Sequence, residues 1–209
     1  EHMAYHIITL EDPLEYIHTD KNCLIHQRQI GEHSLSFAAA LRAALREDPN
    51  VVLVGEMRDN ETIALALTAA EIGLLVLATL HTKSAAQTIS RLVDSFPVDQ
   101  QSQIRMTLSE VLVGICSQQL IRRADGKGRV AALEILVRNH AVATLIRESK
   151  THQIQNAILT GRKEGMQLME QHLKELISRN VITLQEAARH VDNPQALTAA
   201  ASPAAAVNA

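Results

Sequence analysis

The sequence has few aromatic residues and only two cysteines, and both shortages limit what the protein can be. Tryptophan is absent, and aromatic residues make up 2% of the chain. The core must therefore consist of aliphatic side chains, and few rings are available on which nucleic acid bases could stack. Cys23 and Cys116 lie far apart and form no CxxC pair. This excludes a disulfide framework and argues against a zinc site of the usual spacing, so we expect two reduced, buried thiols.

Long runs of one charge and long apolar stretches are also absent. The chain has 20 basic and 23 acidic residues, which gives a net charge of -3. This balance argues against a dominant electrostatic grip on nucleic acid or on an anionic membrane. The apolar runs are the length of strands, well below the ~20 residues that a membrane-spanning helix needs, and no signal peptide is recognised. We therefore expect neither nucleic acid binding nor direct insertion into a membrane.

Short apolar strands alternate with helices in the first half of the chain. The strands are predicted at 7–10, 24–30, 51–54 and 74–80, and the helices at 37–47, 60–71, 85–95 and 99–112. This alternation is typical of a parallel sheet flanked by helices. Two more strands are predicted at 115–122 and 130–137, with a hairpin turn signal between them.

The pattern becomes purely helical after residue 137. Four helical segments are predicted at 141–148, 151–160, 166–179 and 183–190. We therefore predict an α/β fold, with a parallel or mixed sheet flanked by helices in residues 4–137 and a small all-helical C-terminal domain in residues 138–191. Residues 1–3 resemble a cloning scar. Residues 192–209 contain too few large apolar side chains to order themselves and are predicted to be a disordered tail.

One buried strand leads directly into an acidic residue. The run 51–54 is β-branched and apolar, as expected of a strand buried on both faces, and Gly55 and Glu56 follow it. This order is typical of a Walker B motif, whose acid binds Mg²⁺ or polarises water. Gly55 occupies the place where many such motors carry Asp, and it leaves space there for backbone or ligand. The alternative is a strand that ends in a polar turn, but the Gly-Glu-x-Arg-Asp sequence is unusual.

Polar residues follow two other predicted strands. Glu11 and Asp12 come at the carboxyl end of the first strand, where open α/β sheets bind ligands. They could hold a metal through water or orient a nucleophilic water, or they could form a solvated turn. His81 follows the strand 74–80 and could contact a γ-phosphate or be purely structural. Independent strands rarely place two glutamates and a histidine at one edge by chance, which favours a functional site.

Three of these segments resemble motifs of the secretion ATPase superfamily, and the similarity extends over about residues 6–191. Residues 8–15 resemble its Asp box, residues 52–59 its atypical Walker B motif, and residues 79–91 its His box. Extension motors and type II secretion ATPases of the superfamily share these three motifs. They therefore indicate the superfamily without choosing a branch.

A fourth segment resembles the branch that retracts type IV pili. Residues 141–148 are similar to its C-terminal helix motif, although Val142 and Ala143 depart from the usual Ala-Ile-Arg start. The part of the motif that is intact consists of Leu145, Ile146, Arg147 and Glu148. The sequence Gly-Met-Gln at 165–167 points to the same branch. The absence of a four-cysteine zinc motif also favours retraction over extension or secretion.

The resemblance implies a hexameric motor of RecA-like cores that hydrolyses ATP with Mg²⁺, each core preceded by a PAS-like domain. Such a motor drives pilus retraction and twitching motility from the cytoplasm, at the inner membrane, through a pilus platform protein. The implied catalytic residues are Glu11, Asp12, Glu56 and His81. Glu56 would lie near Mg²⁺ and would hold it indirectly, through water. Arg58 and Arg91 would supply supporting charges at the nucleotide.

The sequence contains no phosphate-binding loop of the form G-x-x-x-x-G-K-[ST], whose backbone N–H groups cradle phosphate. The stretch 161–165 has glycines but no Gly-Lys-Ser/Thr. In the superfamily this loop precedes the Asp box. We therefore expect a chain truncated before the Asp box, with poor ATP affinity and no activity alone. Loss of a central strand would make the sheet close, pair with another chain or leave a groove.

Three other functions stay open from the sequence. The chain could belong to a pilus extension or type II secretion ATPase of the same superfamily. It could be a non-enzymatic interaction module, in which the helical part docks a partner of the pilus machinery. It could also be a RecA-like ATPase that handles DNA, against which the weak positive charge and the few aromatic residues count.

Overall fold

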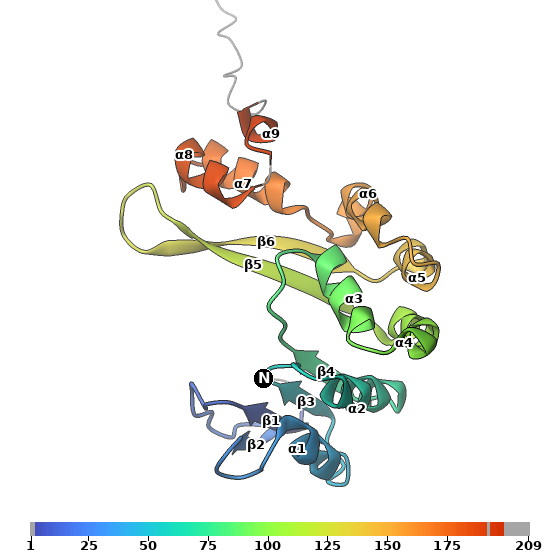
Figure 1. Cartoon of the computed structure of the whole chain (residues 1–209). Helices are drawn as coiled ribbons and strands as arrows, with labels where there is room; N and C mark the ends of the chain where they lie inside the picture. The colour runs from blue at the N-terminus through green and yellow to red at the C-terminus, as the bar shows by residue number, and fades with distance from the viewer. Residues whose placement is uncertain (1–2, 192, 199–209) are drawn as a thin grey trace, which may run out of the picture. The chain divides into compact units, whose positions relative to one another are not determined.

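The computed structural model describes residues 3–191 and 193–198, and its chain forms two compact units (Figure 1). The first unit contains the described residues up to 81 together with 90–112. The second contains residues 82–89 and the described residues from 113 onward. Each unit is built around its own sheet, four-stranded in the first and two-stranded in the second.

The first unit contains a four-stranded sheet in the order β2-β1-β3-β4, and all of its strand pairs are parallel. Its strands are β1 (His6–Glu11), β2 (Leu24–Gln29), β3 (Val51–Val54) and β4 (Leu75–Ala78). The central strands carry β-branched and aliphatic residues, and Ile8, Val52 and Val54 are fully buried. The predicted α/β class and its parallel sheet flanked by helices are confirmed.

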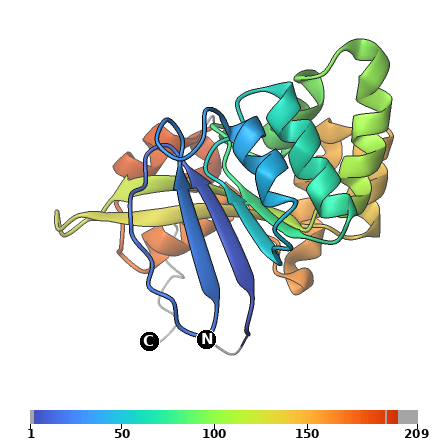
Figure 2. The same cartoon turned by 90° about the horizontal axis from the view of Figure 1, so that it is seen from below.

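Helices α1 (Phe37–Ala44) and α2 (Asn60–Glu71) lie side by side against this sheet (Figure 2). Helix α4 (Val98–Val111) packs on α2. Ser36 and Asp59 cap α1 and α2 by accepting hydrogen bonds from backbone N–H groups three residues on. Helix α1 is three residues shorter than predicted, because the chain turns after it and Asp48 takes a left-handed conformation with φ 52°.

The two edges of the sheet differ in how their outward N–H groups are covered. On β2, the N–H of Ile25 donates to Asp20, and that of Gln29 donates to Nδ1 of His33. On β4, the pairing with β3 leaves the N–H groups of Val76 and Ala78 facing away. Neither has a hydrogen-bond partner within the described parts of the chain, and β4 also has exposed leucine side chains. An open, apolar edge of this kind favours pairing with another strand.

This open edge gives a prediction for hydrogen exchange. The amides of Val76 and Ala78 should exchange about a hundredfold faster than the amide of Leu77, which faces β3, because only the latter lies in the sheet. Residue-resolved exchange by NMR at low protein concentration measures the three rates. Equal protection of all three amides would show that another strand already covers β4.

The second unit is built on an antiparallel hairpin of β5 (Gly114–Arg122) and β6 (Arg129–Val137). The turn between them contains Gly126 and Gly128, both with positive φ, as its glycine-rich sequence predicted. Five α-helices and three short 3-10 helices follow within residues 138–191 and 193–198. They are α5 (His140–Arg147), η1 (Thr151–Gln153), α6 (Ile154–Thr160), η2 (Gly161–Glu164), α7 (Met169–Ser178), α8 (Leu184–Ala187), η3 (Ala188–His190) and α9 (Gln195–Thr198).

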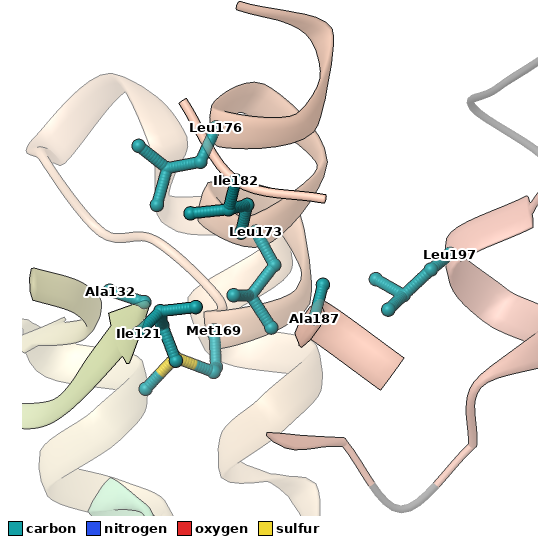
Figure 3. Close-up of a cluster of buried hydrophobic side chains, with 8 residues drawn as sticks. All are labelled: Ile121, Ala132, Met169, Leu173, Leu176, Ile182, Ala187 and Leu197. Atoms are coloured by element: carbon teal, nitrogen blue, oxygen red, sulfur yellow. The ribbon is translucent and has the colours of Figure 1, made fainter. Parts of the chain in front are cut away.

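A buried cluster joins the hairpin to the C-terminal helices (Figure 3). Its members are Ile121, Ala132, Met169, Leu173, Leu176, Ile182, Ala187 and Leu197. The sequence placed the hairpin in the region 4–137 and an all-helical domain after it. Because Ile121 and Ala132 come from the hairpin, the compact unit of the structure includes both, and the domain boundary at 137 stays a prediction.

Three local predictions differ from the structure. The helix expected from residue 166 begins at Met169, because Gln167 pairs with the backbone of Ile135. The predicted tail contains helix α9, since Leu197 is 1% exposed and anchors it in the cluster; residue 192 and residues 199–209 lie outside the described residues. Cys116 is exposed, contrary to the expected burial, because it lies on the outer face of β5.

Helix α3 (Ala85–Asp94) is divided between the two units. Ser84 caps its start by accepting a hydrogen bond from the N–H of Gln87 at 3.3 Å. Within the described ranges 3–191 and 193–198, no helix combines the length and apolarity needed to cross a membrane.

Candidate functional site at the ends of the parallel strands

The parallel sheet brings three predicted segments to one edge. Strands β1, β3 and β4 are consecutive neighbours and run in the same direction. Glu11 ends β1, Glu56 follows β3 and His81 follows β4, so all three stand at the carboxyl edge of the sheet. This is where ligands bind in open α/β sheets.

Glu56 is the centre of an ionic cluster. Its carboxylate lies 2.6 Å from Nη2 of Arg58 and 3.0 Å from Nε2 of His81, and its side chain is only 18% exposed. The hydrogen bond from Arg58 is the main reason that the pKa of Glu56 is lowered; the charges of Arg58 and His81 add to this, and partial burial opposes it. Glu56 therefore keeps its negative charge to lower pH than an ordinary glutamate does.

The same cluster reaches Asp12. Glu56 raises the pKa of Arg58 through its hydrogen bond and its charge, and the charge of Asp12 adds a smaller increase. Asp12 itself is exposed. The guanidinium of Arg58 thus lies within electrostatic reach of acids that follow two adjacent strands, which links the first and second predicted motifs.

Glu11 is held by residues that the sequence did not single out. The hydroxyl of Thr9 donates to its Oε1 at 2.6 Å, and Nε2 of Gln27 donates to the same atom at 3.1 Å. Thr9 lies two residues earlier on β1, and Gln27 comes from the neighbouring strand β2. A threonine two residues before an acid on one strand was the only sequence signal for this contact, since residues i and i+2 share a face.

Gly55 lies where two backbones approach closely. Its N–H donates to the carbonyl of Leu10 at 2.7 Å, and its own carbonyl accepts from the hydroxyl of Thr79. A Cβ atom placed on Gly55 would come within 2.9 Å of the Leu10 oxygen. The glycine therefore serves close backbone contact, one of the two uses that the sequence indicated.

His81 and Arg91 are both exposed and are joined by a hydrogen bond. The side chain of His81 is 76% exposed, and its backbone carbonyl accepts from Nη1 of Arg91 at 3.3 Å. Arg91 and Arg58 thus each contact a member of the Glu56–His81 pair. Arg58 and His81 beside the Glu56 carboxylate, and Arg91 beside the backbone of His81, offer donors for an anionic ligand such as phosphate.

The cluster also suits Mg²⁺ held through water. The described part of the chain has no group of three or more His, Cys, Asp or Glu side chains arranged to hold a metal ion directly. Mg²⁺ usually keeps several waters and binds through one or two carboxylates together with substrate phosphates. A single anionic, partly accessible Glu56 fits that mode, whereas a fully protein-ligated metal does not.

The fourth predicted motif lies in the second unit, on α5. Ile146 is fully buried and Leu145 is partly buried, while Arg147 and Glu148 are exposed. Lys150 lies 2.8 Å from Glu148, and its hydrogen bond and charge lower the pKa of that carboxyl. The motif therefore presents a charged end and anchors itself through its apolar residues.

Comparison with known proteins identifies the family of the chain. The chain belongs to the Type II/IV secretion system protein family, which matches residues 1–207. Its sequence is 51% identical over 193 residues to a twitching motility protein of Neisseria gonorrhoeae, covering 92% of this chain and 52% of the relative. It is 50% identical over 191 residues to the type IV pilus retraction ATPase PilT of Pseudomonas aeruginosa, covering 91% and 55%. The chain is thus a homologue of pilus retraction ATPases.

Solved structures lead to the same family. A crystal structure of the pilus retraction motor PilT with bound ADP superimposes with a TM-score of 0.86 at 49% identity, covering 93% of this chain and 55% of that one. The ATPase DotB of Legionella pneumophila gives a TM-score of 0.78 at 31% identity, covering 88% and 50%. The chain spans about half the length of the curated relatives it matches.

Proposed function

We propose that this chain forms the hydrolytic face of an ATP-driven motor that retracts type IV pili. The observation that carries the proposal is the Glu56 cluster, in which one anionic carboxylate contacts Arg58 and His81 at the carboxyl edge of a parallel sheet. About 50% identity to retraction motors over more than nine tenths of the chain supports the choice of motor.

The proposed roles follow from the contacts at the sheet edge. Glu56 would hold Mg²⁺ through water, and bound Mg²⁺ would neutralise part of the negative charge on the phosphates. Glu11, whose Oε1 is fixed by Thr9 and Gln27, would orient the attacking water together with Asp12. His81 would contact the γ-phosphate, and its side-chain contact with Glu56 would then be broken. Arg58 and Arg91 would stabilise negative charge on the nucleotide.

The remaining features of the motor are also proposals. A segment of the longer protein would provide the phosphate-binding loop, and the open edge of β4 is a site where one of its strands can pair. We propose a homo-hexamer in the cytoplasm that acts on an inner-membrane platform protein of the pilus. The helix carrying Leu145 to Glu148 would serve retraction.

An extension or secretion motor of the same family is less well supported. The assembly ATPase PilB of Thermus thermophilus is 46% identical over 55% of this chain, and the type II secretion system protein HxcR of Pseudomonas aeruginosa is 32% identical over 88%. The retraction ATPase PilT of Pseudomonas aeruginosa combines higher identity with greater coverage, 50% over 91% of this chain. A DNA-handling ATPase or a non-enzymatic module gains no support from the ionic cluster.

The proposal is tested by comparing the chain alone with the chain joined to the N-terminal half of the Neisseria gonorrhoeae relative. The joined protein should hydrolyse ATP with Mg²⁺. The chain alone should not, and calorimetry should detect no micromolar binding of Mg-ATP, because no loop of backbone N–H groups cradles the phosphates. An inactive joined protein that folds and assembles, or tight ATP binding by the chain alone, would contradict it.

A further inference from the structure

A buried carboxylate lies outside the cluster at the sheet edge, in the middle of β6. The side chain of Glu134 is 5% exposed, and Ala132 and Leu136, which share its face of the strand, are 0% and 1% exposed. Burying a carboxylate is costly unless hydrogen bonds satisfy it. The contacts of Glu134 therefore show what offsets that cost.

Glu134 caps a helix that begins 49 residues earlier. Its Oε1 accepts a hydrogen bond from the backbone N–H of Ala85 at 2.8 Å, and Ala85 is the first residue of α3. The first N–H groups of a helix have no partner within the helix, and the helix dipole favours negative charge there. Ser84 satisfies a second one, the N–H of Gln87, from within the local sequence. Two caps thus hold the start of α3, one local and one from β6.

The capped end leads directly back to His81. Only Thr82, Lys83 and Ser84 separate His81 from Ala85. The hydroxyls of Thr82 and Thr88 lie 2.7 Å apart, and Thr88 also donates to the carbonyl of Ser84 at 2.9 Å. This short segment is therefore tied to the first turn of α3, whose position Glu134 fixes.

The outer edge of β6 is held by the C-terminal region at the residues on either side of Glu134. Gln167 exchanges two backbone hydrogen bonds with Ile135, at 2.8 and 2.9 Å, and its side chain donates to the carbonyl of Leu133 at 2.9 Å. The N–H of Leu133 donates to Nδ1 of His172 on α7, at 3.0 Å. Figure 1 shows α7 next to β6. Contacts from Gln167 and from His172, both distant from β6 in sequence, thus fix the backbone on either side of Glu134.

We propose that Glu134 is a positioning residue for the segment that follows His81. It holds the N–H of Ala85, while Gln167 and His172 hold the strand that carries it. This fixes the conformation of residues 82–85 and so restricts the chain that leads out of His81. The consequence for hydrolysis rests on the proposed function; the anchoring of Ala85 does not.

The anchoring is tested by NMR on two variants of the chain, each with one substitution at Glu134. Glu134→Gln keeps an acceptor but removes its charge, so the amide proton of Ala85 should shift upfield and its protection from exchange should change by about twofold or less. Glu134→Leu removes the acceptor, so protection of Ala85 should fall about tenfold. Val142, whose N–H is capped by Asn139 at the start of α5 in the same unit, is the internal control and should not change.

Two results would overturn the anchoring. The first is an unchanged Ala85 amide shift in Glu134→Gln, a variant that keeps the size of the side chain and so should fold even if Glu134→Leu does not. The second is an equal loss of protection at Ala85 and Val142 in Glu134→Leu, which would indicate general destabilisation of the unit. Selective loss at Ala85 supports the proposal.

The consequence for hydrolysis is tested in the joined protein described above. Glu134→Leu should lower kcat about tenfold and change KM for ATP by about twofold or less, and Glu134→Gln should recover most of kcat, because its amide oxygen still holds Ala85. An unchanged kcat in Glu134→Leu overturns the positioning role. If the unsubstituted joined protein does not hydrolyse ATP, the proposed function fails, whereas the NMR result still decides whether Glu134 anchors Ala85.

Discussion

Glu56→Gln should lower the rate of ATP hydrolysis by the joined protein about a hundredfold or more, with little loss of stability. The amide keeps the shape of the side chain and can still accept from Arg58, but it has no negative charge with which to hold Mg²⁺ or polarise water. Removing a group that acts on the attacking water or its proton commonly costs a factor of about 10²–10⁴. Steady-state turnover with saturating Mg-ATP measures the loss.

The matched control is Glu61→Gln. Glu61 lies on α2, forms one exposed ion pair with Arg42 at 2.5 Å and is not part of the strand-end cluster. The same change of carboxylate to amide should there leave turnover within about twofold, because exposed ion pairs contribute little. Equal turnover in Glu56→Gln and the unsubstituted protein would contradict the proposed role of Glu56.

The pH dependence of the cluster has a definite sign. Arg58 lowers the pKa of Glu56 in the folded state, so the ion pair stabilises the fold above the unfolded-state pKa of the carboxyl. That stabilisation is lost as pH falls through the lowered folded-state value. In Glu56→Gln, the free energy of unfolding should therefore differ less between neutral and acidic pH than it does in the unsubstituted protein. A packing effect would lower the free energy of unfolding equally at both pH values, so this comparison distinguishes the two effects.

Local sequence was sufficient to predict the sheet and the strand ends of the site. The apolar runs at 7–10 and 51–54 are short and rich in β-branched residues, as expected of strands buried on both faces, and parallel strands place their carboxyl ends together. The sequence alone therefore predicts Glu11, Glu56 and His81 at one edge of the sheet. The ion pairs among Glu56, Arg58 and His81 are short-range consequences of that placement.

Contacts between distant segments were not predictable in the same way. Gln27 supports Glu11 across a strand pair, and Leu197 orders a helix in a stretch whose composition predicts disorder. Glu134 had a visible signal, an acid in the middle of the apolar strand 129–137, but its partner Ala85 is 49 residues away. Periodicity gives the face of a residue and says nothing about which element will cover it.

Gly55→Ala should destabilise the fold by about 1–3 kcal/mol, the usual cost of forcing extra volume into a well-packed site. An alanine Cβ would lie 2.9 Å from the carbonyl oxygen of Leu10 and 3.3 Å from Cα of Glu11, and both neighbours are backbone atoms that cannot rotate away. Relief of the contact would separate β1 from β3 at the point where the N–H of Gly55 donates to Leu10. Chemical denaturation of the chain, followed by circular dichroism, measures the change in the free energy of unfolding.

Gly126→Asn is the control for this substitution. Gly126 has open space around its Cβ position and a positive φ of 70°, which asparagine tolerates better than most residues, so its replacement should cost about 0.5 kcal/mol or less. A similar loss in both variants would contradict a specific cost of the contact with Leu10, since replacing a glycine restricts the unfolded chain and by itself favours folding. If Gly55→Ala is instead the more damaging of the two, close approach of β1 and β3 explains why glycine precedes Glu56. The close contact between β1 and β3 also sets the distance between the strand ends that carry Glu11 and Glu56. If Gly55→Ala were as stable as the unsubstituted protein, this contact would not be needed, and the case that the two acids act together would be weaker.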